Sequence, residues 1–108
     1  MDVETFSDGT TMGEGESRDG RKHGRWRFFY RTGSVKGEGS FANGQMDGPW
    51  VWHREDGSLM RTGQFVNGEQ RGAWTTYDRS GEPQKTTDFI RAEQRKWEPI
   101  QRAINSAH

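Results

Sequence analysis

The residues that could carry out acid–base or nucleophilic chemistry gather around one short glycine turn. His53, Asp56 and Ser58 lie close together in the chain, and an imidazole, a carboxylate and a hydroxyl are the groups used for proton transfer and nucleophilic attack. Phe29 and Tyr77 stand 24 positions before and after His53. Because aromatic residues occupy these two equivalent positions, a structural role for His53 at a hairpin turn is favoured. We expect no catalytic residues and a protein that is not an enzyme.

Metal and cofactor chemistry also lacks a suitable set of residues. The chain has no cysteine, and its histidines His23, His53 and His108 have no paired spacing of the kind that metal sites use. The segment Gly13-Glu-Gly15 has neither the lysine nor the strand–turn–helix setting of a phosphate loop. Glu55-Asp56 is an ordinary pair of turn residues. We expect no metal and no cofactor.

Side chains suited to recognition, in contrast, lie in the middle of the chain and in the segment that follows the repeat. Tryptophan and arginine are enriched among the residues that dominate binding energy at protein interfaces. We predict a partner-binding set of Trp50, Trp52, His53, Arg54 and Trp97. Trp50 recurs in every unit of the repeat described next and would serve a core equally well. The other four break that repeat, so the fold does not require them.

A tandem repeat of constant length runs through most of the chain. Trp26, Trp50 and Trp74 are separated by 24 positions each. The same step, without an insertion, relates Gly15, Gly39 and Gly63; Gly20, Gly44 and Gly68; Gly24, Gly48 and Gly72; Gly33, Gly57 and Gly81; and Phe41, Phe65 and Phe89. Self-similarity at a fixed period is the signature of a repeat architecture.

Each unit carries the signals of two strands and two turns. Trp26 to Tyr30 is rich in strand-forming residues, a glycine turn follows at Gly33, and Asn43-Gly44 marks a hairpin turn. We therefore predict a mainly β fold, a single antiparallel meander of tandem 24-residue β-hairpin repeats. The array is expected to occupy residues 1–89, as a half unit at 2–15 and units at about 16–39, 40–63 and 64–89.

The expected register places large rings across from glycines. If Tyr30 faces Val35 across the glycine turn, Phe28 faces Gly37 and Trp26 faces Gly39. Side chains alternate between the two faces of a strand. One face is then aromatic, with Trp26, Phe28, Tyr30 and Phe41 followed by Trp50, Trp52, Leu59 and Phe65. The other face is mainly polar, with Arg25, Arg27, Lys36 and Glu38. A one-residue bulge would shift this pairing.

The repeat ends near Phe89, and a different composition follows. Residues 90–108 lack glycine and are rich in helix formers, and apolar residues including Trp97, Ile100 and Ile104 are spaced at near-helical intervals. Pro99 would kink one helix or begin a second. We predict a C-terminal α-helical segment at 90–108 that covers one end of the sheet. A partner-binding helix is the alternative.

Composition limits the classes of partner. Only 28% of residues are hydrophobic, but 12% are aromatic, and each buried aromatic removes roughly 150–250 Å² from water. The 16 basic and 16 acidic residues give no net charge, which argues against a general nucleic-acid binder. The first ten residues lack the apolar segment of a signal peptide, and no apolar stretch is long enough to span a membrane. We expect a cytoplasmic protein.

The repeated residues resemble a known family, the MORN repeats. The resemblance covers about residues 2–89 and is carried by Gly24-Arg-Trp26, Gly39-Ser-Phe-Ala-Asn-Gly44, Gly48-Pro-Trp50, Gly63-Gln-Phe-Val-Asn-Gly68 and Gly72-Ala-Trp74. It is closest to the variant of bacterial YwqK-type antitoxin-like proteins. The resemblance implies an elongated sheet of hairpins used for protein binding or self-association, with some eukaryotic members linked to phospholipids. The third unit departs from the pattern, because Thr76 and Asp78 replace Phe28 and Tyr30.

These observations favour a non-enzymatic protein-binding module, such as a small inhibitor that blocks a partner protein in the manner of an antitoxin or a phage anti-defence protein (an anti-CRISPR, for example). Single-stranded nucleic acid on an aromatic and basic sheet is a further class, but no nucleic-acid partner is expected, and two alternatives stay open. One is a phospholipid or membrane-surface binding scaffold, for which Lys22, Arg25, Arg27, Arg31 and Lys36 supply basic residues. The other is a homodimeric structural scaffold in which two aromatic faces meet.

Overall fold

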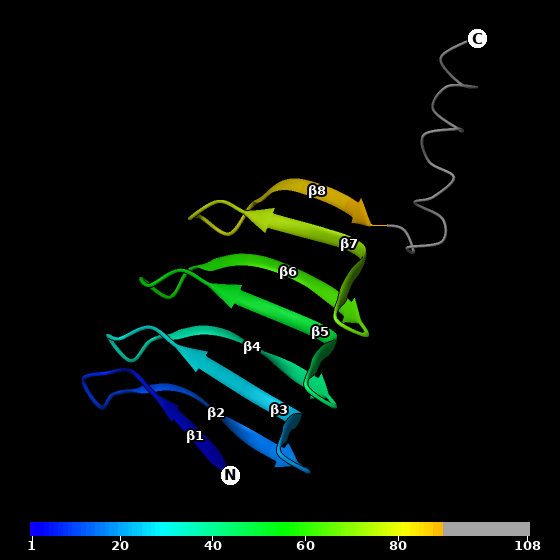
Figure 1. Ribbon diagram of the computed structural model, residues 1–108. Helices are drawn as coiled ribbons and strands as arrows, with labels where there is room; N and C mark the ends of the chain where they lie inside the picture. The colour runs from blue at the N-terminus through cyan, green and yellow to red at the C-terminus, as the bar shows by residue number, and fades with distance from the viewer. Residues whose placement is uncertain (90–108) are drawn as a thin grey trace, which may run out of the picture.

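The structure, a computed structural model, describes residues 1–89 and forms one sheet of eight strands in chain order (Figure 1). The strands are β1 (Asp2–Thr5), β2 (Thr11–Arg18), β3 (Arg21–Phe29), β4 (Val35–Ala42), β5 (Gln45–His53), β6 (Leu59–Val66), β7 (Glu69–Tyr77) and β8 (Pro83–Phe89). Every neighbouring pair is antiparallel. The predicted single antiparallel meander is thus confirmed. The predicted helix at 90–108 lies outside the described residues.

Two kinds of turn alternate along the sheet. The turn between β4 and β5 has positive φ at both central residues, 51° at Asn43 and 86° at Gly44, which is the type I′ geometry whose twist suits a hairpin. The turn between β3 and β4 is longer: Gly33 N–H donates to Tyr30 O (2.9 Å) and Tyr30 N–H donates to Ser34 O (2.9 Å). Both turns recur at the equivalent positions of the other units, so the repeat in sequence is a repeat in geometry.

The repeated tryptophans lie directly over the repeated glycines of the preceding strand. The ring of Trp50 covers Gly39 so closely that a Cβ atom at that position would collide with it. The same relation joins Trp26 to Gly15 and Trp74 to Gly63. The strand pairing shifts register beside each of these glycines. Each tryptophan therefore requires a neighbour without a side chain.

The indole N–H of each of these tryptophans is also satisfied in the same way. Trp50 Nε1 donates to Ser40 O at 3.0 Å, the carbonyl that follows the covered glycine. Trp26 Nε1 donates to Glu16 O at 2.6 Å and Trp74 Nε1 donates to Gln64 O at 3.1 Å. A buried indole N–H without an acceptor would cost free energy. The register shift beside each glycine thus places a carbonyl where the indole needs it.

The predicted register is correct along the strands and wrong at the glycine turn. Trp26 pairs with Gly39 and Phe28 pairs with Gly37, as predicted, but Val35 pairs with Phe29 instead of Tyr30. The bulged glycine turn adds a residue on the β4 side and sets Tyr30 against Ser34. The same shift pairs Leu59 with His53. The ring of Trp26 also covers Gly15, on the other neighbouring strand from its pairing partner Gly39.

The core of the described residues consists of three side chains. Trp26 is 2% exposed, Trp50 0% and Trp74 2%, and the other buried positions within residues 1–89 are glycines. One layer of sheet holds the three rings, since residues 1–89 contain no second sheet or helix. None of this part of the chain forms a helix long and apolar enough to cross a membrane. Stability therefore rests on how well each indole fits its glycine.

We predict that Gly39→Ala destabilises the protein strongly. The added methyl group meets the fully buried Trp50 ring, and overpacking of this kind costs about 1–3 kcal/mol. The measurement is urea unfolding followed by tryptophan fluorescence. Thr87 supplies the matched control, because it occupies the repeat position of Gly63 in the edge strand β8. Thr87→Ala should change the free energy of unfolding by less than about 0.5 kcal/mol; equal effects of the two substitutions would contradict the close fit.

Candidate binding face

The rings of eight residues form a continuous series on one face of the sheet, here called the aromatic face: Trp26, Phe28, Phe41, Trp50, Trp52, Phe65, Trp74 and Phe89. Ring centroids of Phe28 and Trp50 are 6.2 Å apart and those of Trp50 and Trp52 are 5.2 Å apart, both stacked. Phe65 meets Trp74 edge-on at 5.0 Å. Offset-stacked and edge-to-face contacts are the favourable arrangements of aromatic pairs. The series joins β3 to β8 without a gap.

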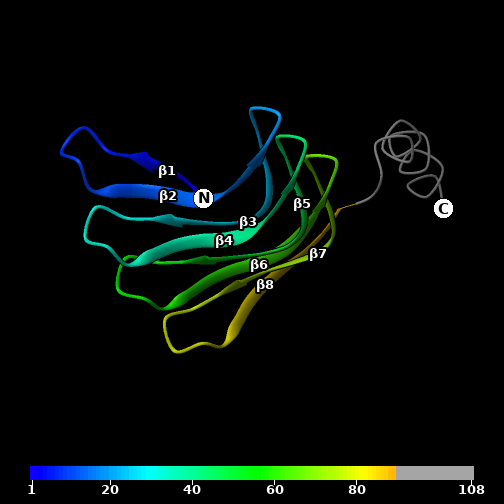
Figure 2. The ribbon, with the colours of Figure 1, turned by 90° about the horizontal axis from the view of Figure 1, so that it is seen from below.

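The aromatic face lies on the inside of a bend. Figure 2 shows that each hairpin is bent along its length. Phe41 pairs with Gly24, four residues from Phe28 along β3, a separation of about 13 Å in a straight strand. The Phe28 and Phe41 ring centroids are nevertheless 6.1 Å apart. The rings thus meet across the inside of the bend, on the concave side of the backbone.

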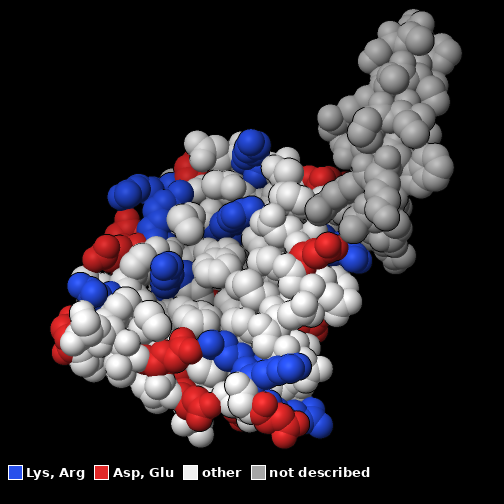
Figure 3. Space-filling model, viewed as in Figure 1, with Lys and Arg blue, Asp and Glu red and all other residues white. Residues whose placement is uncertain are grey.

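Five of the eight rings are only partly covered. Phe28, Phe41, Trp52, Phe65 and Phe89 are half-buried, whereas the other three are the buried tryptophans. In Figure 3, uncharged side chains cover much of the middle of the molecule, with individual lysine and arginine side chains among them. Most acidic side chains lie toward the rim. The uncovered part of each of these five rings gives a partner apolar surface to contact.

Cations lie over several rings of this face. Lys22 Nζ is 5.0 Å from the Trp26 ring centroid and also pairs with Glu4 at 2.7 Å. The guanidinium of Arg61 is 4.5 Å from the Trp74 ring centroid. Such contacts are favourable, since a cation is attracted to the face of an aromatic ring. They leave the face aromatic with a positive local charge.

Of the predicted partner-binding residues, the two tryptophans of β5 lie on the aromatic face in different settings. Trp50 is 0% exposed, so its ring has no surface to offer a partner and serves the core. Trp52 is half-buried, stacks on Trp50 and covers Gly37. Trp52 is therefore the residue of this pair that a partner could reach. Trp97 lies outside the described residues.

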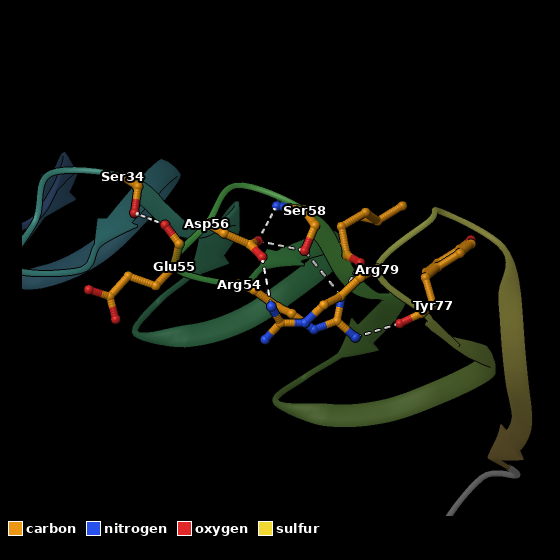
Figure 4. A network of polar contacts seen from close by, with 8 residues as sticks. Ser34, Arg54, Glu55, Asp56, Ser58, Tyr77 and Arg79 are labelled. Carbon is orange, nitrogen blue, oxygen red and sulfur yellow. Dashed lines mark hydrogen bonds and ion pairs between the residues drawn. The ribbon is translucent and has the colours of Figure 1, made fainter.

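His53 and Arg54, also in the predicted set, take part in hydrogen bonds between neighbouring hairpins. Tyr30 Oη donates to His53 O at 2.7 Å. Arg54 occupies the position of Tyr30 in the next unit, and donates from Nη2 to Tyr77 O at 2.6 Å and from Nη1 to Leu59 O at 2.9 Å (Figure 4). The Tyr30 and Arg54 side chains thus each reach a carbonyl of the next unit, and His53 takes part through its backbone carbonyl. The main role of Arg54 in the structure is therefore to link neighbouring repeats.

The turn that holds the candidate catalytic groups is organised by Asp56. Asp56 Oδ1 accepts the backbone N–H of Ser58 at 2.8 Å and its hydroxyl at 2.6 Å, and Asp56 Oδ2 accepts Arg79 Nη1 at 3.1 Å (Figure 4). The pKa of Asp56 is lowered, mostly by the hydrogen bond from the Ser58 hydroxyl. The Ser58 N–H and the Arg79 guanidinium lower it further. This contribution to stability is present above the unfolded pKa and is lost as pH falls through the folded value. The Asp56–Ser58 pair thus stabilises the turn.

No cluster of His, Asp or Glu that could hold a metal ion occurs within residues 1–89. The predicted polar face is present, because Arg25 pairs with Ser40 and Arg27 with Glu38 on the side opposite the aromatic rings. Lys36 lies at the register shift, with Nζ 5.8 Å from the Tyr30 ring centroid. We take the aromatic face as the candidate binding site because its eight rings form one continuous series.

Comparison with family models gives one match. Residues 22–43 match the MORN repeat variant. The matched stretch contains β3 from Lys22 onward, all of β4, and Asn43 of the hairpin turn. The tryptophan and glycine positions of Trp26 and Gly24 recur in each of the next two units, so the neighbouring hairpins repeat the sequence pattern of the matched stretch. Comparison with curated proteins gives no match.

Removing the links between hairpins should loosen the sheet without unfolding it. We predict that Tyr30→Phe, which loses one hydrogen bond, lowers the free energy of unfolding by about 0.5–1.5 kcal/mol, and that Arg54→Met lowers it by about 1–3 kcal/mol. Urea unfolding measures both. Arg25→Met is the control, since Arg25 is exposed on the opposite face. If Arg54→Met is as harmless as Arg25→Met, the linking role of Arg54 is wrong.

Proposed function

We propose that this protein is a non-enzymatic binding module that holds a segment of another protein on its concave aromatic face. The observation that carries the proposal is the continuous series of rings on a sheet of a single layer, in which half-buried Phe28, Trp52 and Phe65 each contact the buried Trp50. Rigid aromatic side chains supply large contact area with little loss of conformational entropy. The MORN match at residues 22–43 also supports a binding role.

The shape of the face favours an inserted segment over a second copy of the chain. Good interfaces have complementary surfaces, and two concave faces would meet only along their rims. A helix or extended segment, by contrast, presents a convex surface, which suits a face on the inner side of bent hairpins (Figure 2). A homodimer joined through its aromatic faces is therefore the less favoured alternative.

A phospholipid surface is also disfavoured as the ligand. The basic residues that would serve it are divided, because Lys22 lies over Trp26 on the aromatic face while Arg25 and Arg27 lie on the opposite face. Arg27 is further paired with Glu14 at 3.1 Å. A membrane-binding surface needs its cations on one side. An inhibitor of an antitoxin or anti-CRISPR type remains a finer form of the protein-binding proposal, supported by the small size and zero net charge of the chain.

The proposal is tested with Trp52→Thr, because the third unit already has Thr76 at this position and the sheet accommodates it there. The tagged chain is used to capture a partner from its native host, and the isolated partner is then titrated calorimetrically. Trp52→Thr should weaken binding by about tenfold or more, as loss of a hot-spot aromatic does. Phe29→Ala is the control, since Phe29 is half-buried beside Arg27 on the opposite face and should bind normally.

Three outcomes would contradict the proposal. One is a partner that binds Trp52→Thr as tightly as the unaltered chain. Another is sedimentation with anionic liposomes in place of any protein partner. The third is a dimer by light scattering that Trp52→Thr dissociates, which would favour the homodimeric scaffold.

A further inference from the structure

A row of directly paired residues crosses the aromatic face from one edge of the sheet to the other. Each member is the pairing partner of the next on the adjacent strand. From β1 to β8 the row reads Glu4, Gly13, Phe28, Gly37, Trp52, Arg61, Thr76 and Lys85. Because paired residues share a face, all eight belong to the aromatic face. The row allows the units to be compared position by position.

The first two units follow one pattern and the third changes both of its members. Phe28 lies over Gly13 and Trp52 lies over Gly37, where an added Cβ atom would be 2.8 Å and 2.5 Å from the ring respectively. In the third unit Arg61 takes the glycine position and Thr76 takes the ring position. The loss of the ring above it is what makes room for the arginine. Lys85 then occupies the next glycine position, in the edge strand.

This substitution leaves two cations without counter-charges. Neither Arg61 nor Lys85 takes part in any ion pair formed within residues 1–89, whereas Lys22 at the opposite end is paired with Glu4. Both cations flank Thr76 on adjacent strands, so their Cα atoms are about 10 Å apart. Arg61 is half-buried and Lys85 is exposed. The β6–β8 end of the row, here called the cationic end (Arg61, Thr76, Lys85), is thus positive and accessible.

We propose that the cationic end receives the carboxylates of an acidic segment of the partner protein, whose apolar side chains pack on Trp52 and Phe65. This inference rests on the proposed function and adds the chemistry of the partner. Arginine and lysine recognise carboxylates through charge-assisted hydrogen bonds, and complementary charges select partners and fix their orientation. At the other edge of the row Glu4 and Lys22 neutralise each other, so that end has no net charge to attract an acidic segment. The bound segment therefore has its acidic part over β6–β8.

The remaining segment of this chain is a poor candidate for the same place. Residues 90–108 contain the basic residues Arg91, Arg95, Lys96 and Arg102 and only Glu93 and Glu98 as acidic residues. Their net charge has the same sign as that of the cationic end. Charge complementarity thus favours a separate acidic chain over residues 90–108.

The inference is tested on the full-length chain with two synthetic peptides of about twelve residues. One alternates glutamate and leucine, and the other alternates lysine and leucine. Nuclear magnetic resonance follows the indole N–H signals of Trp52 and Trp74 in the labelled protein during titration. We expect the glutamate peptide to shift both signals, and the lysine peptide to leave them unchanged. Raising the salt concentration should weaken binding of the glutamate peptide, since exposed charges are screened.

Variants assign the binding to the two cations. Lys85→Glu and Arg61→Gln should each lower the affinity for the glutamate peptide by about two- to fivefold, the range expected for exposed ion pairs. Arg25→Glu, a charge change on the opposite face, should not. Lys85 is exposed on an edge strand, so Lys85→Glu keeps the test valid if Arg61→Gln disturbs Trp74.

Several results would overturn the acidic partner. If both peptides shift Trp52 alike, the aromatic face still binds but charge does not select its partner, and the proposed function survives. If Lys85→Glu and Arg61→Gln bind the glutamate peptide as tightly as Arg25→Glu, the cationic end is not the contact. If neither peptide binds, an acidic segment is refuted, while capture with Trp52→Thr decides the proposed function separately.

Discussion

The constraint on which the sheet depends is the close approach of an indole ring to a glycine on the preceding strand. Trp26, Trp50 and Trp74 are the buried side chains of the described structure, and none could sit where it does above a residue with a Cβ atom. The hydrophobic effect drives these rings out of water, but a single-layer sheet has no second layer to receive them. The bare backbone of a glycine replaces that layer, and the carbonyl beside it accepts the indole N–H.

This constraint explains why so much of the fold was predictable from the sequence. Glycine serves two purposes here, positive φ in the turns and space beneath the rings, and both recur with the period of the repeat. The spacing therefore predicted the strands, their order and most of their register. The pairing at the glycine turn was not predictable, because Tyr30 and Phe29 are equally good partners for Val35 by side-chain type. The bulge that decides between them is set by backbone hydrogen bonds at Gly33.

The candidate site was predictable only in part, for a related reason. Residues that break the repeat were expected to bind a partner, and Trp52 lies suitably on the aromatic face. Arg54 breaks the repeat as well, yet it makes the same link to the next unit that Tyr30 makes. Sequence alone could not reveal that arginine and tyrosine reach equivalent carbonyls. Arg61 and Lys85 were missed because their meaning depends on the cross-strand row, which requires the register.

Each ring requires the bare glycine that it covers, and a double-mutant cycle on Gly37 and Trp52 tests this requirement most directly. The free energies of unfolding of Gly37→Ala, Trp52→Thr and the double variant are measured with urea. Gly37→Ala alone should destabilise the protein because its methyl group meets the Trp52 ring. In the Trp52→Thr background that penalty should vanish, giving a coupling of at least about 1 kcal/mol. An equal penalty in both backgrounds would contradict this requirement.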